Sequence, residues 1–227
     1  MTTRSTITRA DTMYSQSAYY PPANALPGLP ISPTNYLNFG VVAAASANAI
    51  CASQSSTGGT NALIVNGALA TAGVATIPTP RNVVAAWTNT AIATITGTDY
   101  YGQTQTETSA SGTSHTGKKA FATITAVTFN AAVTGATVGT GVKLGLPHRV
   151  DANGILDALT DNLPDTTYTF VAADTTSPAT TTTGDVRGTI AAATAPNGTH
   201  FYAVNYVIAD RTGGSDHKTG AYGVAPV

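Results

Sequence analysis

The chain has 227 residues, only 9% of them charged, and its formal net charge at pH 7 is -1. An ordinary globular protein has about 25% charged residues, so this composition favours a protein whose surfaces are largely covered by neighbouring subunits. The near-zero charge, with no basic cluster larger than Lys118-Lys119, argues against nucleic acid as a partner.

The cysteine content and the hydropathy of the chain indicate the cellular compartment in which it folds. The single cysteine, Cys51, excludes a disulfide within the chain and favours folding in a reducing cytoplasm. We expect Cys51 to be a small buried apolar side chain rather than a reactive thiol. The segment Met1–Arg9 lacks the apolar core of a secretory signal, and no run approaches the roughly 18 apolar residues of a membrane helix. We therefore expect neither secretion nor a membrane as a partner.

Residues 1–40 differ in composition from the rest of the chain. Five of the 12 prolines lie between Pro21 and Pro33, and proline at this density favours extended, polyproline-like backbone. Four of the 10 tyrosines also lie here: Tyr14, Tyr19, Tyr20 and Tyr36. Tyrosine rings pack on another surface while their hydroxyl groups stay hydrated. A linker is one interpretation; we favour an arm that lies across a neighbouring subunit and binds it through these four tyrosines.

The next segment contains short elements. Val41–Ser56 is compatible with an alanine-rich helix or with a strand. Leu63–Val65 and Val74–Ile77 are predicted to be short strands. We expect Pro78 and Pro80 to end this part of the domain.

From Arg81 to Leu146 the pattern predicts roughly five strands, at the 8–12-residue spacing of sandwiches and barrels. In the longest run, Lys118–Phe129, apolar and polar residues alternate, with Phe121, Val127 and Phe129 expected on one face. The turn Asp99–Gly102 predicts a hairpin in which glycine supplies the required backbone angle.

The C-terminal part begins with an acid-rich connection from Pro147 to Asp174. Ile155–Leu159 is predicted to form one helical turn, and Tyr168–Val171 and Gly184–Ile190 to form strands. A turn at Ala195–Thr199 precedes a strand at His200–Ile208. Both faces of this strand are mostly apolar, which indicates burial on both sides, either in a sandwich or at a subunit contact.

These patterns predict an all-β fold: an antiparallel β-sandwich or jelly-roll-like domain with an extended N-terminal arm. We place the arm at residues 1–40 and the domain at 41–227, with 41–147 and 148–227 as a further division into two sub-parts.

Two segments resemble binding motifs. Gly112–Lys119 is close to a phosphate-binding loop, but it lacks the Ser or Thr after the lysine and precedes a predicted strand instead of a helix. We expect a hairpin loop there. Asp151, Asn153 and Asp157 surround Gly154 as in a calcium loop, but the closing glutamate is absent, which favours a polar surface turn and leaves an ion site open.

No catalytic pattern is evident. The four histidines, His115, His148, His200 and His217, do not have metal-ligand spacing, and there is no Gly-x-Ser-x-Gly motif. We expect His148 to be a structural or interface residue. The sequence predicts a non-enzymatic protein without catalytic, cofactor-binding or metal-binding residues.

Several short motifs between Gly67 and Ile208 resemble virion structural proteins of tailed bacteriophages. They are Gly67–Ala75, Pro80–Val83, Ile95–Gly102, Thr106–Thr108, Lys119–Thr125, Val138–Pro147 and Asp185–Thr189. Within that group the chain is most similar to capsid decoration (cement) proteins, which bind the outside of a shell built from a major capsid protein.

The resemblance implies a β-rich fold, commonly a homotrimer, no enzymatic role, and localisation on the capsid surface of the virion after synthesis in the host cytoplasm. The major capsid protein and further copies of this chain are the expected partners. Two alternatives remain open: another virion part, such as a tail, neck or fibre protein, or a secreted Ig-like adhesion module.

Overall fold

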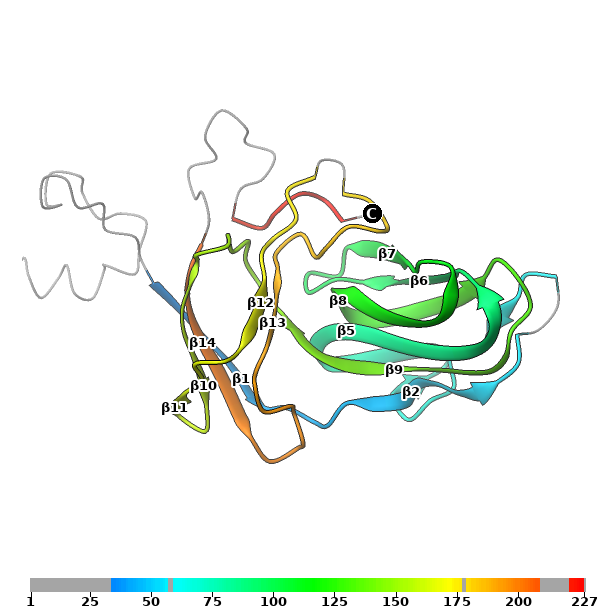
Figure 1. The fold of residues 1–227 in the computed structure, drawn as a ribbon, viewed down its shortest axis with the longest axis horizontal. Helices are drawn as coiled ribbons and strands as arrows, with labels where there is room; N and C mark the ends of the chain where they lie inside the picture. The colour runs from blue at the N-terminus through cyan, green and yellow to red at the C-terminus, as the bar shows by residue number, and fades with distance from the viewer. Residues whose placement is uncertain (1–33, 57–58, 177–178, 209–220, 227) are drawn as a thin grey trace, which may run out of the picture.

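The computed structural model describes residues 34–56, 59–176, 179–208 and 221–226. The regular elements in these ranges are all β-strands, and every strand pair is antiparallel. They form two sheets; most of the larger one lies at the right of Figure 1 and the smaller one at the left. The predicted all-β, antiparallel fold class is confirmed.

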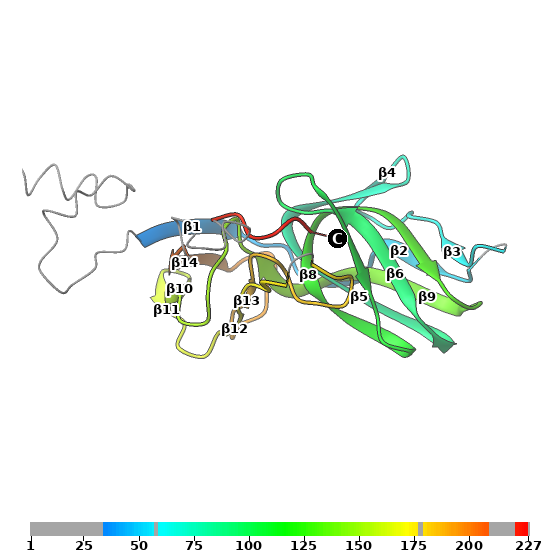
Figure 2. The ribbon, with the colours of Figure 1, turned by 90° about the horizontal axis from the view of Figure 1, so that it is seen from above.

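The larger sheet is curled, and Figure 2 shows that it bends into a half-barrel. Its strand order is β12-β13-β9-β5-β8-β6-β7, with β2 on β9, β3 on β8 and β4 on β5. The strands are β2 (Ser46–Gln54), β3 (Ala62–Leu63), β4 (Ala70–Thr71), β5 (Val74–Ala91), β6 (Ala93–Thr98), β7 (Thr104–Thr108), β8 (Gly112–Phe129), β9 (Thr134–Gly145), β12 (Thr169–Val171) and β13 (Thr189–Ala191).

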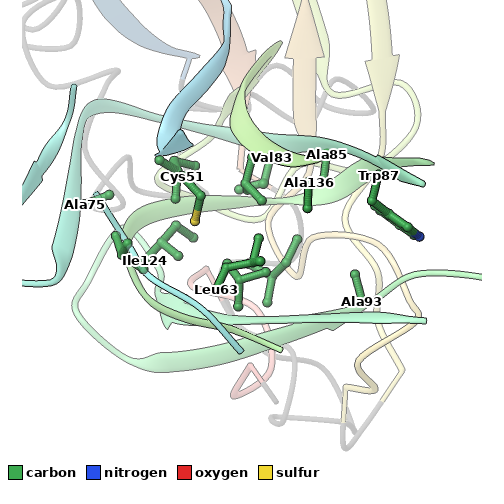
Figure 3. Packing of buried hydrophobic residues seen from close by; sticks show 14 of the residues in the cluster. Cys51, Leu63, Ala75, Val83, Ala85, Trp87, Ala93, Ile124 and Ala136 are labelled. Atoms are coloured by element: carbon green, nitrogen blue, oxygen red, sulfur yellow. The ribbon is translucent and has the colours of Figure 1, made fainter. Parts of the chain in front are cut away.

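Apolar side chains fill the inside of this curl. Cys51 from β2, Val83 from β5 and Ile124 from β8 are fully buried and point into the same interior (Figure 3). Trp87 and Phe129 meet edge to face there, with ring centroids 5.0 Å apart. Each such large side chain stabilises the fold by roughly 1.5–3 kcal/mol through burial, so this cluster is the main core.

The smaller sheet has the order β1-β14-β10-β11, formed by β1 (Thr34–Val41), β14 (Phe201–Val207), β10 (Ile155–Thr160) and β11 (Leu163–Pro164). Tyr202, Val204 and Tyr206 of β14 pack with Leu144 and Leu146 at the end of the larger sheet, making a second core. The inward side chains of β14 join the two sheets. On the other face Phe201, Asn205 and Val207 are only half-buried, so the predicted burial on both sides is not reached within this chain.

β1 lies inside the segment assigned to the arm. Residues 34–40 pair with β14, because Leu37 and Phe39 alternate with polar residues and pack on the second core. The arm, as an extended segment outside the sheets, therefore comprises at most residues 1–33, which lie outside the described residues. Each sheet also draws strands from both sides of residue 147.

The expectation that Pro78 and Pro80 end a strand is wrong, because β5 runs through both. Thr76 pairs with Thr123 and Arg81 with Phe121, so the four β5 residues between these pairs face a single residue of β8. The prolines fall within this irregularity, where the ladder does not require their missing N–H groups. Strand β5 consequently bends at the prolines and continues.

The predicted hairpin loop at Gly112–Lys119 is also wrong, because this segment forms the first part of β8. Pairing with β5 extends back to Gly112 opposite Ala91. The strict alternation expected for the second part of β8 is broken at Thr125. Its neighbours Ile124 and Ala126 pair with Gly97 and Thr96, so Thr125 forms a bulge. This bulge brings Ile124 into phase with Val127, and the irregularity opposite Pro78 and Pro80 lies between Ile124 and Phe121, so all three side chains are in the core.

The secondary structure of three further segments differs from, or decides between, the sequence-based expectations. Val41–Ser56 contains strand β2 rather than a helix. Ile155–Leu159 is strand β10 and not a helical turn, because Ile155 and Ala158 lie opposite Tyr206 and Val204 of β14. The strand expected at Gly184–Ile190 is confined to β13, since the residues before Thr189 make polar contacts described below.

Candidate functional site

The four tyrosines predicted to bind partners divide into two groups. Tyr14, Tyr19 and Tyr20 lie outside the described residues. Tyr36 is on β1 opposite Asn205, and 57% of its surface is exposed. The structure therefore places one of the four on the surface of a sheet.

Cys51 is fully buried in the main core, and burial raises the pKa of its thiol to about 12. Such a thiol is a weak nucleophile at neutral pH. This agrees with the expectation of a structural cysteine.

The described histidines are held by separate partners. His148 Nδ1 is 2.6 Å from the Tyr206 hydroxyl, which joins the connection after β9 to β14. His200 Nδ1 is 2.6 Å from Asp161 Oδ2 at the surface, and His115 Nε2 is 3.6 Å from Glu107 Oε2. His217 lies outside the described residues. His148 thus has the structural role that was predicted for it.

Asp151 and Asp157 have different surroundings, and Asn153 is exposed. The Asp151 carboxylate pairs with Arg149 at 3.2 Å, whereas Asp157 lies on β10 opposite Asn205. Within the described ranges no group of three or more His, Cys, Asp and Glu side chains could hold a metal ion. The same ranges contain no helix with the length and apolar character needed to cross a bilayer.

The predicted hairpin turn between β6 and β7 is confirmed, and Asp99 organises it. Asp99 Oδ1 accepts hydrogen bonds from the backbone N–H groups of Tyr101 and Gln103, both at 2.8 Å. Gly102 has a φ of 78° and donates its N–H to the Asp99 carbonyl. The turn holds Tyr101 at the surface beside the connection that follows β9, where the Tyr101 hydroxyl donates to the Pro147 carbonyl at 2.6 Å.

The other oxygen of Asp99 forms a buried ion pair with an arginine from a distant part of the chain. Arg187 Nη2 lies 2.9 Å from Asp99 Oδ2, and both side chains are almost completely buried. The Arg187 guanidinium carbon is also 5.4 Å from the centre of the Tyr101 ring, a cation–π contact. This pair fixes the segment before β13 against the β6–β7 hairpin.

Asp185, two residues before Arg187, anchors the same segment to β8. Its Oδ2 accepts a hydrogen bond from the Ala120 N–H at 2.8 Å and its Oδ1 accepts one from the Arg187 N–H at 2.9 Å. Burial raises the pKa of the Asp185 carboxyl, and the Arg187 charge acts in the opposite direction. Burial likewise lowers the pKa of Lys119, which is fully enclosed beside Glu107 and Asp185.

Glu107 completes this buried polar layer from β7. Its Oε1 accepts hydrogen bonds from the N–H groups of Lys118 at 2.5 Å and Lys119 at 3.3 Å. Gln105, two residues earlier, donates to the Ala120 carbonyl at 2.6 Å. The layer thereby binds β7 to the first part of β8 with side chains instead of a backbone ladder. We conclude that these charges hold the β6–β7 hairpin, β8 and the segment before β13 together.

A surface cleft opens above the Asp99–Arg187 pair. It has a volume of about 480 Å³ and is lined by Tyr101, Gln103, Arg187 and the C-terminal segment 222–225. Tyr222 forms one wall and 60% of its surface is exposed. Its ring is 5.4 Å from the Tyr101 ring at an interplanar angle of 87°. We call this feature the tyrosine cleft.

Aromatic rings connect the tyrosine cleft to the smaller sheet. The Tyr222 ring centre lies 5.6 Å from that of His148, which is 6.0 Å from the ring of Tyr206 on β14. Burial raises the pKa of the Tyr101 hydroxyl, with a further contribution from Tyr222. Because the cleft offers ring faces, an amide and a neutralised arginine, it suits an uncharged ligand with apolar rings and hydrogen-bond acceptors.

The second candidate surface is the face of the smaller sheet that points away from the core. Because Tyr202, Val204 and Tyr206 point inward, the alternate residues of β14 and their cross-strand partners point outward. This outer face comprises Tyr36, Asn38, Val41, Asp157, Leu159, Phe201, Ala203, Asn205 and Val207. It carries one charged residue, and Tyr36 and Val41 are among the most exposed large apolar residues of the described chain.

β1 is also the edge strand of this sheet. Among the described strands it pairs with β14 alone. The register of β1 shifts between Asn38 and Gly40, and Gly40 has a φ of 70°. On the edge that does not face β14, regular pairing with a further strand is therefore confined to residues 34–38. An edge strand of this kind presents N–H and C=O groups to an additional strand.

Comparison with protein-family models, with curated proteins and with solved structures found no match for this chain.

Proposed function

We propose that this chain is a non-enzymatic virion structural protein: a capsid decoration (cement) protein that binds the outer surface of a shell and stabilises contacts between capsomers. The observation that carries the proposal is the outer face of the smaller sheet. It carries two of the exposed large apolar residues of the described chain, Tyr36 and Val41, and a single charged residue, Asp157, on a chain in which only 9% of residues are charged.

Such a face has the chemistry of a subunit contact. Large exposed apolar side chains gathered on one surface are typical of interaction sites, and depletion of charge is typical of interface centres. The free edge of β1 adds a second means of attachment, because a partner strand can hydrogen-bond to it. In the proposed complex the partner is the major capsid protein, and Tyr36 together with Tyr14, Tyr19 and Tyr20 contacts it.

The resemblance of the motifs between Gly67 and Ile208 to phage decoration proteins supports the same assignment. We further propose a homotrimer, because oligomers of identical subunits usually have closed symmetry and the family resembled here commonly forms trimers. The protein would be made in the host cytoplasm and localise to the capsid surface.

The test is whether the protein binds capsid shells through the outer face. Tyr36→Lys places a charge on the most exposed strand of this face, and we expect it to reduce the number of copies retained on purified particles at least about tenfold. Ile64→Lys is the matched control, because Ile64 is similarly exposed, at 59%, but lies outside the smaller sheet.

Quantitative mass spectrometry of purified particles measures the copy number. Equal retention of Tyr36→Lys and wild type would contradict the role of the outer face. A few copies per particle would move the protein to the tail, neck or fibre, and absence from particles together with surface display on the producing cell would favour the adhesion module.

A further inference from the structure

The tyrosine cleft has the chemistry of a site for a proline-rich chain. Aromatic rings are the surfaces on which proline rings pack in the known recognition of polyproline II segments. The extended backbone of such a segment has no internal hydrogen bonds, so its carbonyl groups need donors. The cleft offers the rings of Tyr101 and Tyr222 and the exposed amide of Gln103.

The chain itself contains a segment with the matching pattern. Pro27, Pro30 and Pro33 are spaced three residues apart, and Pro21 falls in the same register. A polyproline II helix has three residues per turn, so these rings would line up along one side. Pro22 is one position out of this register. The segment 14–33 contains no charged residue, which matches a cleft whose arginine is already neutralised by Asp99.

The position of β1 puts this segment within reach of the cleft. Pro33 is bonded to Thr34, the first residue of β1, and Asn35 lies opposite Tyr206 of β14. From Tyr206 the rings of His148 and Tyr222 lead to the cleft in two steps of 6.0 and 5.6 Å. A polyproline segment advances about 3.1 Å per residue, so the segment 27–33 can span this interval.

We propose that the segment Pro27–Pro33 binds the tyrosine cleft of its own chain. Attachment through Thr34 gives the segment a high effective concentration at the cleft. In this arrangement the cleft fixes the base of the arm, and the residues before it, which include Tyr14, Tyr19 and Tyr20, extend from a defined point on the domain. The proposal goes beyond the proposed function and can be tested without any particle.

The experiment is site-specific photo-crosslinking in the full-length protein. Leu29, between Pro27 and Pro30, is replaced by benzoylphenylalanine, and the crosslinked peptides are identified by mass spectrometry. We expect crosslinks concentrated on the peptides that contain Tyr101–Gln103 and Tyr222–Ala225. Crosslinks spread over the surface, or concentrated on the outer face, would overturn the proposal.

Matched variants test the register and the cleft. Pro30→Ala should lower the crosslinking yield by roughly fivefold, the change expected from losing one buried ring contact, whereas Pro22→Ala should not. Tyr222→Ala should lower the yield similarly. Leu163→Ala should not, since Leu163 is 69% exposed and lies on β11, away from the cleft lining. Equal yields in all four variants would contradict the proposal. Circular dichroism verifies that each variant is folded.

An isotope mixture identifies the chain that supplies the segment. Unlabelled and ¹⁵N-labelled proteins, both carrying the photoreactive residue, are mixed before irradiation under conditions that permit subunit exchange. Crosslinks between peptides of the same label support binding within one chain. A statistical proportion of mixed-label crosslinks would show that a second copy occupies the cleft and would overturn the proposal.

Discussion

The buried Asp99–Arg187 pair makes a strong prediction about stability. Asp99→Asn keeps an oxygen that can accept hydrogen bonds from the N–H groups of Tyr101 and Gln103, but it removes the charge 2.9 Å from Arg187. Breaking a buried ion pair by removing one partner costs about 3–5 kcal/mol. Because Asp185 also interacts with Arg187, we expect the lower end of this range, a loss of about 3 kcal/mol in the free energy of unfolding.

Urea denaturation monitored by circular dichroism measures this loss. Asp99→Ala should be worse by about 2–3 kcal/mol, because two hydrogen bonds to the turn are removed as well. Asp151→Asn is the control: its partner is Arg149, but the Asp151 side chain is 56% exposed, and an exposed pair contributes at most about 1 kcal/mol. A loss below about 1 kcal/mol for Asp99→Asn would refute the view that this pair holds the hairpin in place.

Three further predictions concern the core, the sheet contacts and pH. Cys51 should resist iodoacetamide at pH 8 while the protein is folded and react after denaturation; rapid alkylation of the folded protein would contradict its burial. Gly139→Ala should destabilise the protein by at least about 1–3 kcal/mol, because its Cβ would collide with the Ser46 backbone of β2, whereas Gly112→Ala has open space; equal thermal midpoints would contradict this contact. The Asp161 pKa lies below its ordinary value of 3.8, chiefly through a backbone hydrogen bond, so its contribution is present above pH 3.8 and is lost as the pH falls through the folded value. Asp161→Asn should therefore be less stable than wild type at pH 6 and approach it at low pH; a constant difference would contradict this.

The local sequence pattern predicted the fold class and most strands, but not how far the strands extend. Local propensity predicts that Pro78 and Pro80 end a strand. Strand β5 nevertheless continues past them, because its hydrogen-bond ladder with β8 is interrupted at these positions. The glycine and serine residues before Lys118 indicated a loop, yet β5 supplies a partner as far as Gly112. Both errors arise because the length of a strand depends on its pairing partner, which is remote in sequence. Local propensity carries no information about that partner.

The candidate site was less accessible to sequence reasoning. The Asp99–Gly102 turn was predicted from its residues, but its ion pair with Arg187 joins positions 88 residues apart (187 minus 99). One signal was available: Asp185 and Arg187 are charged residues in a stretch otherwise of small and apolar residues, in a chain with few charges. Charges in such surroundings are buried only when paired. The outer face, in contrast, depends on the register of β1 with β14, which requires the structure.

We propose that this protein coats a capsid shell, and its copy number in purified particles tests this proposal most directly. We expect hundreds of copies per particle, together with a trimer in solution by light scattering. Particles that contain no copies of the protein, with a monomer in solution, would contradict it.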